Sequence, residues 1–137
     1  MRGSVLPKQA IRTLLTSHPP LVSGLLDPDL QLQPCGIDLT VSTVSRISGA
    51  GQLGTRNSAR ILPEYENLTF DDGGWIYLES GPYLVSLNET IHLPTHLAAL
   101  GWTRSSLLRS GVNLSSSVWD PGYHGRSQCL LTVQNPA

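Results

Sequence analysis

The sequence has few charged residues, few lysines and no long apolar run, and each shortage excludes a class of function. Charged residues are 14% of the 137 residues, Lys8 is the single lysine, and the net charge is −1. No basic or acidic surface is therefore available to attract nucleic acid, and we expect no nucleic-acid partner. No apolar run approaches the ~18 residues of a membrane helix, and the N-terminus lacks a signal peptide's apolar stretch. We expect a cytoplasmic protein with no membrane partner.

Cysteine is also scarce. Cys35 and Cys129 stand far apart in the chain, which excludes a disulfide framework and matches no metal-ligand spacing. We interpret them as two buried free thiols, with a lone disulfide as the alternative.

Glycine, proline and hydroxyl residues are abundant by contrast, with 13 Gly and 10 Pro. They separate short apolar stretches, which is the pattern of a β domain rich in turns. We predict a mainly β fold, a distorted β-barrel or jelly roll of short strands with one short N-terminal helix. The length predicts a single domain over residues 1–137.

Local patterns place the elements. Apolar residues at helical spacing predict a helix over residues 5–16, followed by a connector over 21–34. Alternation predicts a strand over 37–42 with Asp38 on the face opposite Ile37, and a Gly/Ser-rich loop over 48–59. A helical turn is predicted at 105–110, closed by Gly111. Further strands are predicted at 68–70, 75–79, 83–87, 90–93, 97–102, 112–119 and 128–133.

Three segments are more polar than a β scaffold requires, namely 36–39, 102–111 and 119–125. In the second, Arg104 precedes Ser105 and Ser106 at a helix start, where a guanidinium, hydroxyls and backbone amides suit a phosphate. A serine N-cap beside a solvated arginine is the alternative interpretation.

The third segment places the Asp120 carboxylate on a tight turn with Tyr123 three residues later. A turn aspartate that caps local amides is the alternative. We interpret His124 as an exposed loop histidine, because no second His or Cys stands nearby at metal spacing. His92 and His96 are separated by Pro94, which prevents them from sharing a helix face.

In order and content, the three segments resemble the motifs of the dUTPase/dCTP deaminase superfamily. The first motif is similar to Gly36-Ile37-Asp38-Leu39, the second to Arg104-Ser105-Ser106 with Gly111, and the third to Trp119-Asp120-x-x-Tyr123-x-Gly125. The form Asp120-Pro121-Gly122 and the N-terminal helix resemble the deaminase-like branch, which includes archaeal dUTPases.

The resemblance implies a homotrimer whose active sites lie between subunits and take a deoxynucleoside triphosphate. By the same resemblance, Asp120 orients the attacking water and touches the 3′-hydroxyl, while Tyr123 stacks on the deoxyribose and excludes a 2′-hydroxyl. Arg104, Ser105 and Ser106 hold phosphates, and Mg²⁺ is carried by the triphosphate, mostly without direct protein ligands. Asp38 supports the phosphates or a neighbouring subunit, and Gly111 and Arg109 complete the substrate-binding set.

The carboxylates present discriminate between the family's reactions. Its deaminases need a Glu near Leu130 or Thr132, and the chain has no Asp or Glu from Pro121 to Ala137. We therefore expect a dUTP diphosphatase, an enzyme that hydrolyses dUTP to dUMP and pyrophosphate. Arg109 in Arg-Ser-Ser-x-x-Arg resembles the deaminase pattern, so a dCTP deaminase or a bifunctional enzyme is the alternative.

The chain ends before two further family segments, a Gly-x-x-x-x-Gln stretch and a glycine-rich arm that closes over the phosphates. The domain is thus expected to lack the C-terminal motifs, and a catalytically inactive nucleotide-binding relative is another alternative. Without the resemblance, the same pattern suits a β-sandwich binding module.

Overall fold

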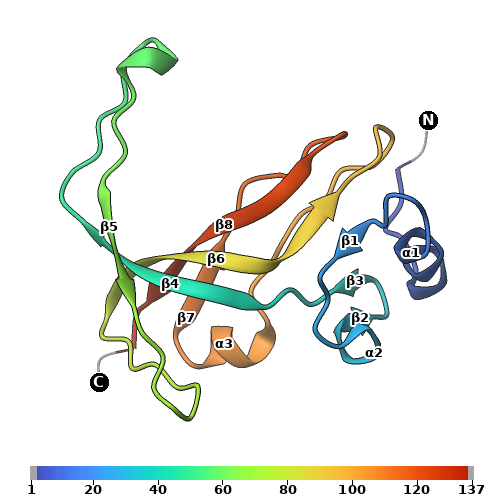
Figure 1. Cartoon of the computed structure of the whole chain (residues 1–137), viewed down its shortest axis with the longest axis horizontal. Coiled ribbons are helices and arrows are strands. Elements are labelled where there is room, and N and C mark those ends of the chain that lie inside the picture. The colour runs from blue at the N-terminus through green and yellow to red at the C-terminus, as the bar shows by residue number, and fades with distance from the viewer. Residues whose placement is uncertain (1–2, 136–137) are drawn as a thin grey trace. The chain divides into compact units, whose positions relative to one another are not determined.

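The computed structural model describes residues 3–135, most of whose regular structure is strand (Figure 1). In chain order the elements are α1 (Lys8–Leu15), β1 (Val22–Ser23), α2 (Pro28–Gln31), β2 (Leu32–Gln33), β3 (Gly36–Ile37), β4 (Val41–Ser48), the 3₁₀ turn η1 (Asn57–Ala59), β5 (Glu64–Leu68), β6 (Gly81–His92), α3 (Ser105–Arg109), β7 (Val112–Ser115) and β8 (His124–Val133).

The chain divides into two compact units that alternate along the sequence. The first unit contains the residues up to Ser42 together with 86–101 and 117–127. The second contains 43–85, 102–116 and the residues from Gln128 onward. The earlier prediction of a single domain over residues 1–137 stays a prediction.

The main sheet has the strand order β5-β4-β6-β8-β7, with β1 paired to β6, and β2 and β3 form a two-stranded sheet. The register is antiparallel where β4 meets β5, with Val44 opposite Leu68, and where β7 meets β8, with Leu114 opposite Leu131. The mainly β prediction is confirmed. The sheets are not closed, as in a distorted jelly roll.

The two longest strands supply much of the core through alternation of their side chains. Every second residue of β6 from Tyr83 to Ile91 is buried, and β8 repeats the pattern from Ser127 to Val133. Side chains alternate between the two faces of a strand, so the buried face of each strand forms one continuous row. The apolar core of the first unit consists of Ile11, Leu21, Val22, Leu32, Leu87, Ile91, Leu93 and Trp119. That of the second consists of Val44, Tyr83, Val85, Cys129, Leu131 and Val133.

Several local predictions are confirmed. The N-terminal helix forms as α1, with Ile11 buried and Pro7 at its N-cap, where a missing N–H costs nothing. The predicted helical turn is α3, and residues 48–59 are mostly irregular. Both cysteines are free thiols, as predicted, but the prediction that both are buried is wrong for Cys35, which lies exposed in the turn between β2 and β3 while Cys129 is buried.

Other local predictions are wrong. The expected connector 21–34 contains β1, α2 and β2; α2 forms because Asp27 caps it, its Oδ1 accepting from the amides of Asp29 and Leu30, both at 3.1 Å. Residues 75–79 form no strand, and 97–102 contribute only the bridge of Ala99 to Trp119.

The prediction of one strand over residues 37–42 is also wrong, and it matters most because this segment contains Asp38. The structure has no continuous strand there, because β3 ends at Ile37 and β4 begins at Val41, so Asp38 lies in the irregular step between them. The backbone of this step bonds to the side chains of Gln31 in α2 and Glu89 in β6, and the Thr40 carbonyl oxygen accepts from the backbone amide of Asn88 in β6 at 2.9 Å. Hydrogen bonds to residues that are distant in the sequence do not alter the alternation of apolar and polar residues, so this pattern could not predict them.

Candidate functional site

Asp120 begins a tight turn that leads into β8. The amide of Tyr123 donates to the carbonyl oxygen of Asp120 at 3.0 Å, and Gly122 has a φ of +82°. A positive φ at the third turn position is the geometry of a type II turn, for which Pro121 at the second position is well suited. The predicted turn is confirmed, and it leaves the Asp120 side chain exposed.

The residues on either side of this turn are fixed by hydrogen bonds of their own unit. The indole of Trp119, which is buried, donates to the hydroxyl of Ser127 at 2.6 Å. The Tyr123 hydroxyl lies 3.2 Å from the same serine oxygen and donates to the carbonyl oxygen of Arg126 at 3.2 Å. Both aromatic rings are therefore held from the start of β8. The exposed carboxylate of Asp120 projects from a rigid frame.

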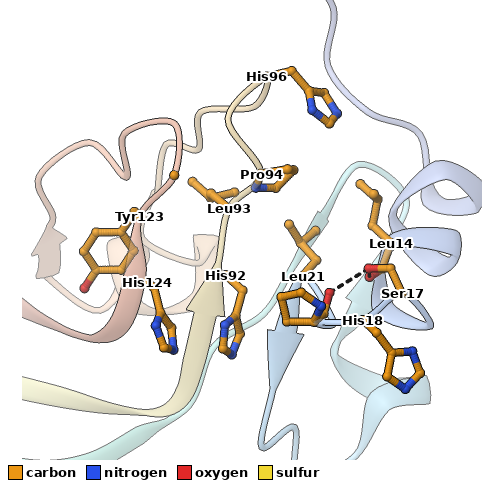
Figure 2. A pocket seen from close by; sticks show the side chains of 12 residues that line it. Leu14, Ser17, His18, Leu21, His92, Leu93, Pro94, His96, Tyr123 and His124 are labelled. Carbon is orange, nitrogen blue, oxygen red and sulfur yellow. Dashed lines mark hydrogen bonds between the residues drawn. The ribbon is translucent and has the colours of Figure 1, made fainter.

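A cavity of about 630 Å³ lies beside this turn, and part of the third segment lines it (Figure 2). Its lining comes from the end of α1, the end of β6 and the start of β8: Leu14, Ser17, His18, Pro19, Leu21, His92, Leu93, Pro94, His96, Gly122, Tyr123 and His124. All four histidines of the chain are in this lining. Asp120 is not part of it.

Two of the histidines form a stacked pair. The ring centroids of His92 and His124 are 4.2 Å apart with an interplanar angle of 24°, and Figure 2 shows the rings side by side. His92 Nε2 also lies 3.4 Å from the hydroxyl of Ser23 on β1. The prediction that His124 is exposed is confirmed, although it opens β8 and is not in a loop. Sequence reasoning missed this convergence, because the residues come from separate parts of the chain.

Asp38 is held through its backbone. Its amide donates to the carbonyl oxygen of Gln31 at 2.8 Å, and its carbonyl oxygen accepts from Gln31 Nε2 at 2.8 Å. Gln31 Nε2 also donates to Glu89 Oε1 at 2.7 Å. Glu89 was missed at the level of sequence. A signal was present, because alternation along β6 puts it on the same face as Leu87 and Ile91.

The Arg-Ser-Ser segment, defined as residues 102–111, belongs to the second unit. Thr103 attaches its start to β7: the Thr103 hydroxyl accepts from the amide of Leu114 at 2.7 Å and donates to the carbonyl oxygen of the same residue at 3.1 Å. Arg104 occupies the N-cap position of α3. No serine caps this helix, so the alternative of a serine N-cap is wrong, and Ser105 and Ser106 lie exposed in its first turn.

Gly111 turns the chain from α3 into β7. Its φ is +73°, a conformation that costs residues with a Cβ about 1–2 kcal/mol. An added Cβ would lie 3.2 Å from the Cβ and 3.3 Å from the amide nitrogen of Asn135. The carbonyl oxygen of Gly111 accepts a hydrogen bond from the amide of Gln134 at 2.8 Å. The glycine is required by its conformation and by the close approach of Asn135, which follows the end of β8.

The structure thus groups the predicted site residues by unit. Asp38, Asp120 and Tyr123 belong to the first unit. Arg104, Ser105, Ser106, Arg109 and Gly111 belong to the second, and the side chains of Arg104, the two serines and Arg109 are exposed.

Within residues 3–135, no group of three or more His, Cys, Asp or Glu side chains is arranged to hold a metal ion. No helix among these residues is long and apolar enough to span a bilayer. Burial raises the pKa of the Cys129 thiol.

Comparison with known proteins agrees with the motifs. A family model described as dCTP deaminase-like matches residues 5–137. The chain belongs to the dCTP deaminase-like family. Its resemblance to the dUTPase/dCTP deaminase superfamily is confirmed.

Several curated relatives of this chain are archaeal proteins. A protein of Methanosarcina mazei is 42% identical over 134 residues, which are 98% of this chain and 78% of the relative. One of Methanococcoides burtonii is 41% identical over 132 residues, covering 96% and 78%. Both are named "Probable deoxyuridine 5'-triphosphate nucleotidohydrolase". A protein of Methanocaldococcus jannaschii, named "Deoxyuridine 5'-triphosphate nucleotidohydrolase", is 42% identical over 107 residues, covering 77% and 69%.

Proposed function

We propose that this chain is a dUTP diphosphatase, which hydrolyses dUTP to dUMP and pyrophosphate. The observation that carries the proposal is its identity of about 40% over nearly its whole length with archaeal proteins named as deoxyuridine triphosphate nucleotidohydrolases. The exposed carboxylate on a rigid turn supports it, because hydrolysis of a phosphoanhydride needs an oriented water and charge neutralisation, and no covalent nucleophile.

In the proposed reaction, Asp120 orients a water molecule and accepts its proton. The water oxygen bonds to phosphorus, the anhydride bond between the α- and β-phosphates breaks, and pyrophosphate leaves with the bonding electron pair. The substrate is the Mg²⁺ complex of dUTP, in which phosphate oxygens coordinate the ion. The rigid frame around Asp120 lowers the reorganisation needed to reach the transition state.

The other site residues bind the substrate. The ring of Tyr123, held through its hydroxyl, packs on the deoxyribose and leaves no space for a 2′-hydroxyl. Arg104 and Arg109 supply charged donors to the phosphates, and Ser105 and Ser106 supply neutral ones. Gly111 gives the Arg-Ser-Ser segment its shape, and Asp38 supports the phosphates or a neighbouring subunit.

We also propose that the enzyme is a homotrimer in the cytoplasm, with each site shared by neighbouring chains. Apolar exposure on the Arg-Ser-Ser segment supports this assembly: Trp102 is 77% exposed and Leu108 is 61% exposed. Light scattering at micromolar concentration should give about three chains per particle. A monomer at that concentration would contradict the shared site.

Deamination of dCTP is the second candidate, and Arg109 in the Arg-Ser-Ser-x-x-Arg pattern favours it. The position where deaminases need a glutamate is near Leu130 or Thr132, and β8 contains no carboxylate. Hydrolysis of dUTP needs no such group, so it remains the preferred reaction.

Product analysis tests the proposal. The chain is incubated with Mg²⁺ and either dUTP, dCTP or UTP, and pyrophosphate, ammonia and the nucleotide products are measured. We expect dUMP and pyrophosphate from dUTP, and no ammonia from dCTP. Ammonia from dCTP would make the chain a deaminase, and tight dUTP binding without turnover would make it an inactive relative.

A further inference from the structure

The most deeply buried charged group of the first unit lies outside the residues assigned above. The Glu89 side chain is 0% exposed, in a row of core residues along β6 where its neighbours are Leu87 and Ile91. A buried carboxylate is costly unless donors surround it. Glu89 forms no ion pair among the described residues, so hydrogen bonds must stabilise its charge.

Glu89 accepts hydrogen bonds from two residues. Gln31 Nε2 donates at 2.7 Å, the Thr40 hydroxyl donates at 2.7 Å, and the Thr40 amide lies 3.0 Å and 3.2 Å from the two carboxylate oxygens. Bonds from donors to a carboxylate are about twice as strong as those between neutral groups. Both polar donors of Thr40 therefore depend on this one side chain.

The rest of the network holds the same short stretch of backbone. Asn88, next to Glu89, uses its amide nitrogen to donate to the Thr40 carbonyl oxygen at 2.9 Å and its Nδ2 to donate to the Thr40 hydroxyl at 2.9 Å. Gln31 bonds to both the amide and the carbonyl of Asp38, and its own Oε1 accepts from the amide of Asp27 at 3.0 Å. These bonds fix the orientation of the Gln31 amide and clamp residues 38–40 from two sides.

An apolar residue at position 89 would fill the core without the cost of a buried charge. Replacement of a buried charge network by apolar residues is often neutral or stabilising. An apolar residue could not accept hydrogen bonds from the Thr40 amide and hydroxyl. It also could not fix Gln31, which donates to the Asp38 carbonyl oxygen. At the step between β3 and β4, the network thus adds side-chain hydrogen bonds to the backbone bonds from Asn88 to Thr40 and from Asp38 to Gln31.

We propose that Glu89 is a positioning residue for dUTP hydrolysis, which acts by holding the backbone of residues 38–40 so that Asp38 is correctly placed. This inference rests on the proposed function for its kinetic consequence. Its structural part, the clamp itself, is testable without any turnover.

The test is a double-mutant cycle of Glu89→Gln and Asp38→Asn, read as kcat and KM for dUTP and as hydrogen exchange of the amides of residues 38–41. Ser45→Ala is the matched control, since Ser45 is also buried and donates one hydrogen bond, to Asn67 at 2.7 Å in the second unit. Thr40→Val is a milder second variant, because it removes one donor to Glu89 and keeps the carboxylate.

We expect Glu89→Gln to lower kcat about 10- to 100-fold, as loss of supporting partners around site residues does. In the Asp38→Asn background the same change should cost less than about threefold, because residues that act as a unit are not additive. Amide exchange over 38–41 should accelerate in Glu89→Gln and, to a smaller degree, in Thr40→Val, and should be unchanged in Ser45→Ala.

Multiplicative kinetic effects, or unchanged exchange over 38–41, would overturn the inference. An unmutated chain that does not hydrolyse dUTP, but whose residues 38–41 still exchange faster in Glu89→Gln, would overturn the proposed function and leave the clamp standing. If Glu89→Gln does not fold, Thr40→Val alone decides: it must couple to Asp38→Asn and accelerate exchange over 38–41.

Discussion

The side chains beside Asp120 are held by hydrogen bonds, whereas the Arg-Ser-Ser segment has a fixed backbone and exposed side chains. Trp119 and Tyr123 both reach Ser127, so the turn of Asp120 is rigid before any ligand arrives. In the other segment, Thr103 and Gly111 fix the path of the chain, but Trp102 and Leu108 remain uncovered.

This difference in side-chain support suits the two regions to different roles in the proposed reaction. A group that orients water gains from a frame that does not reorganise during the reaction. A phosphate-binding segment instead has to meet a charged ligand, and exposed arginines and serines suit that encounter. The uncovered apolar side chains beside them suit burial against a second chain. We therefore expect loss of the Asp120 carboxylate to change kcat and substitutions in the second region to change KM.

Asp120→Asn should have the largest effect. Loss of the group that accepts the proton should lower kcat by about 10²–10⁴, the usual range for general-base loss, while dUTP binding stays nearly unchanged. The fold should be intact because the side chain is exposed. Single-turnover kinetics and dUTP titration check both points, and near-normal turnover would remove Asp120 from the mechanism.

Arg104→Ala should weaken substrate binding and should change kcat less than it changes KM. Loss of hydrogen bonds from a charged donor costs about 1.5–3 kcal/mol, so KM for dUTP should rise about 10- to 150-fold. Arg60→Ala is the matched control, because Arg60 is also exposed but lies outside the Arg-Ser-Ser segment. A fall in kcat at unchanged KM would show that the two regions do not divide the work in this way.

Tyr123→Ala should reduce discrimination between dUTP and UTP. A clash and an unpaired 2′-hydroxyl cost about 1–3 kcal/mol, so the ratio of kcat/KM values should fall about 5- to 150-fold. Tyr123→Phe should keep the ratio, since the ring face excludes the hydroxyl, and lose only the bonds to Arg126 and Ser127. Equal losses on both nucleotides in Tyr123→Ala would make the residue structural.

Gly111→Ala should have the smallest effect and act through stability. The positive φ and the contact with Asn135 together should lower the free energy of unfolding by about 1–2 kcal/mol or slightly more. Gly3→Ala serves as the control, because nothing lies within 4 Å of its added Cβ. Urea denaturation compares the two variants, and equal midpoints would show that the turn into β7 tolerates a side chain.

Local signals were sufficient for the elements that local chemistry determines. Asp120-Pro121-Gly122 specifies a turn, and Gly111 ends a helix whose start is marked by the residues before it. The strand predicted over 37–42 fails for the opposite reason. Its backbone is captured by Glu89, which lies far away in sequence and takes a core position that the alternation of β6 reserves for apolar residues.

The candidate site shows the same division. The chemistry of Arg104, Asp120 and Tyr123 was readable from their own segments, because each combines suitable donors or acceptors with a turn or helix start. The four histidines around one cavity were not, because they come from α1's end, β6 and β8 and meet only through the fold. The burial of Trp119 and the exposure of Trp102 were not predicted either, and this contrast distinguishes the two regions.

Mixing two variants at a dUTP concentration far below the KM of Arg104→Ala, where each alone is nearly inactive, tests the central claim, that Asp120 and Arg104 of neighbouring chains complete one site. Asp120→Asn and Arg104→Ala are combined in equal amounts, denatured and refolded together, and pyrophosphate release from dUTP is measured. Random assembly of a cyclic trimer gives an intact Asp120 beside an intact Arg104 at about a quarter of the sites. The account therefore predicts recovery of about a quarter of the unmutated activity. Activity no greater than the mean of the two separately refolded variants would contradict it.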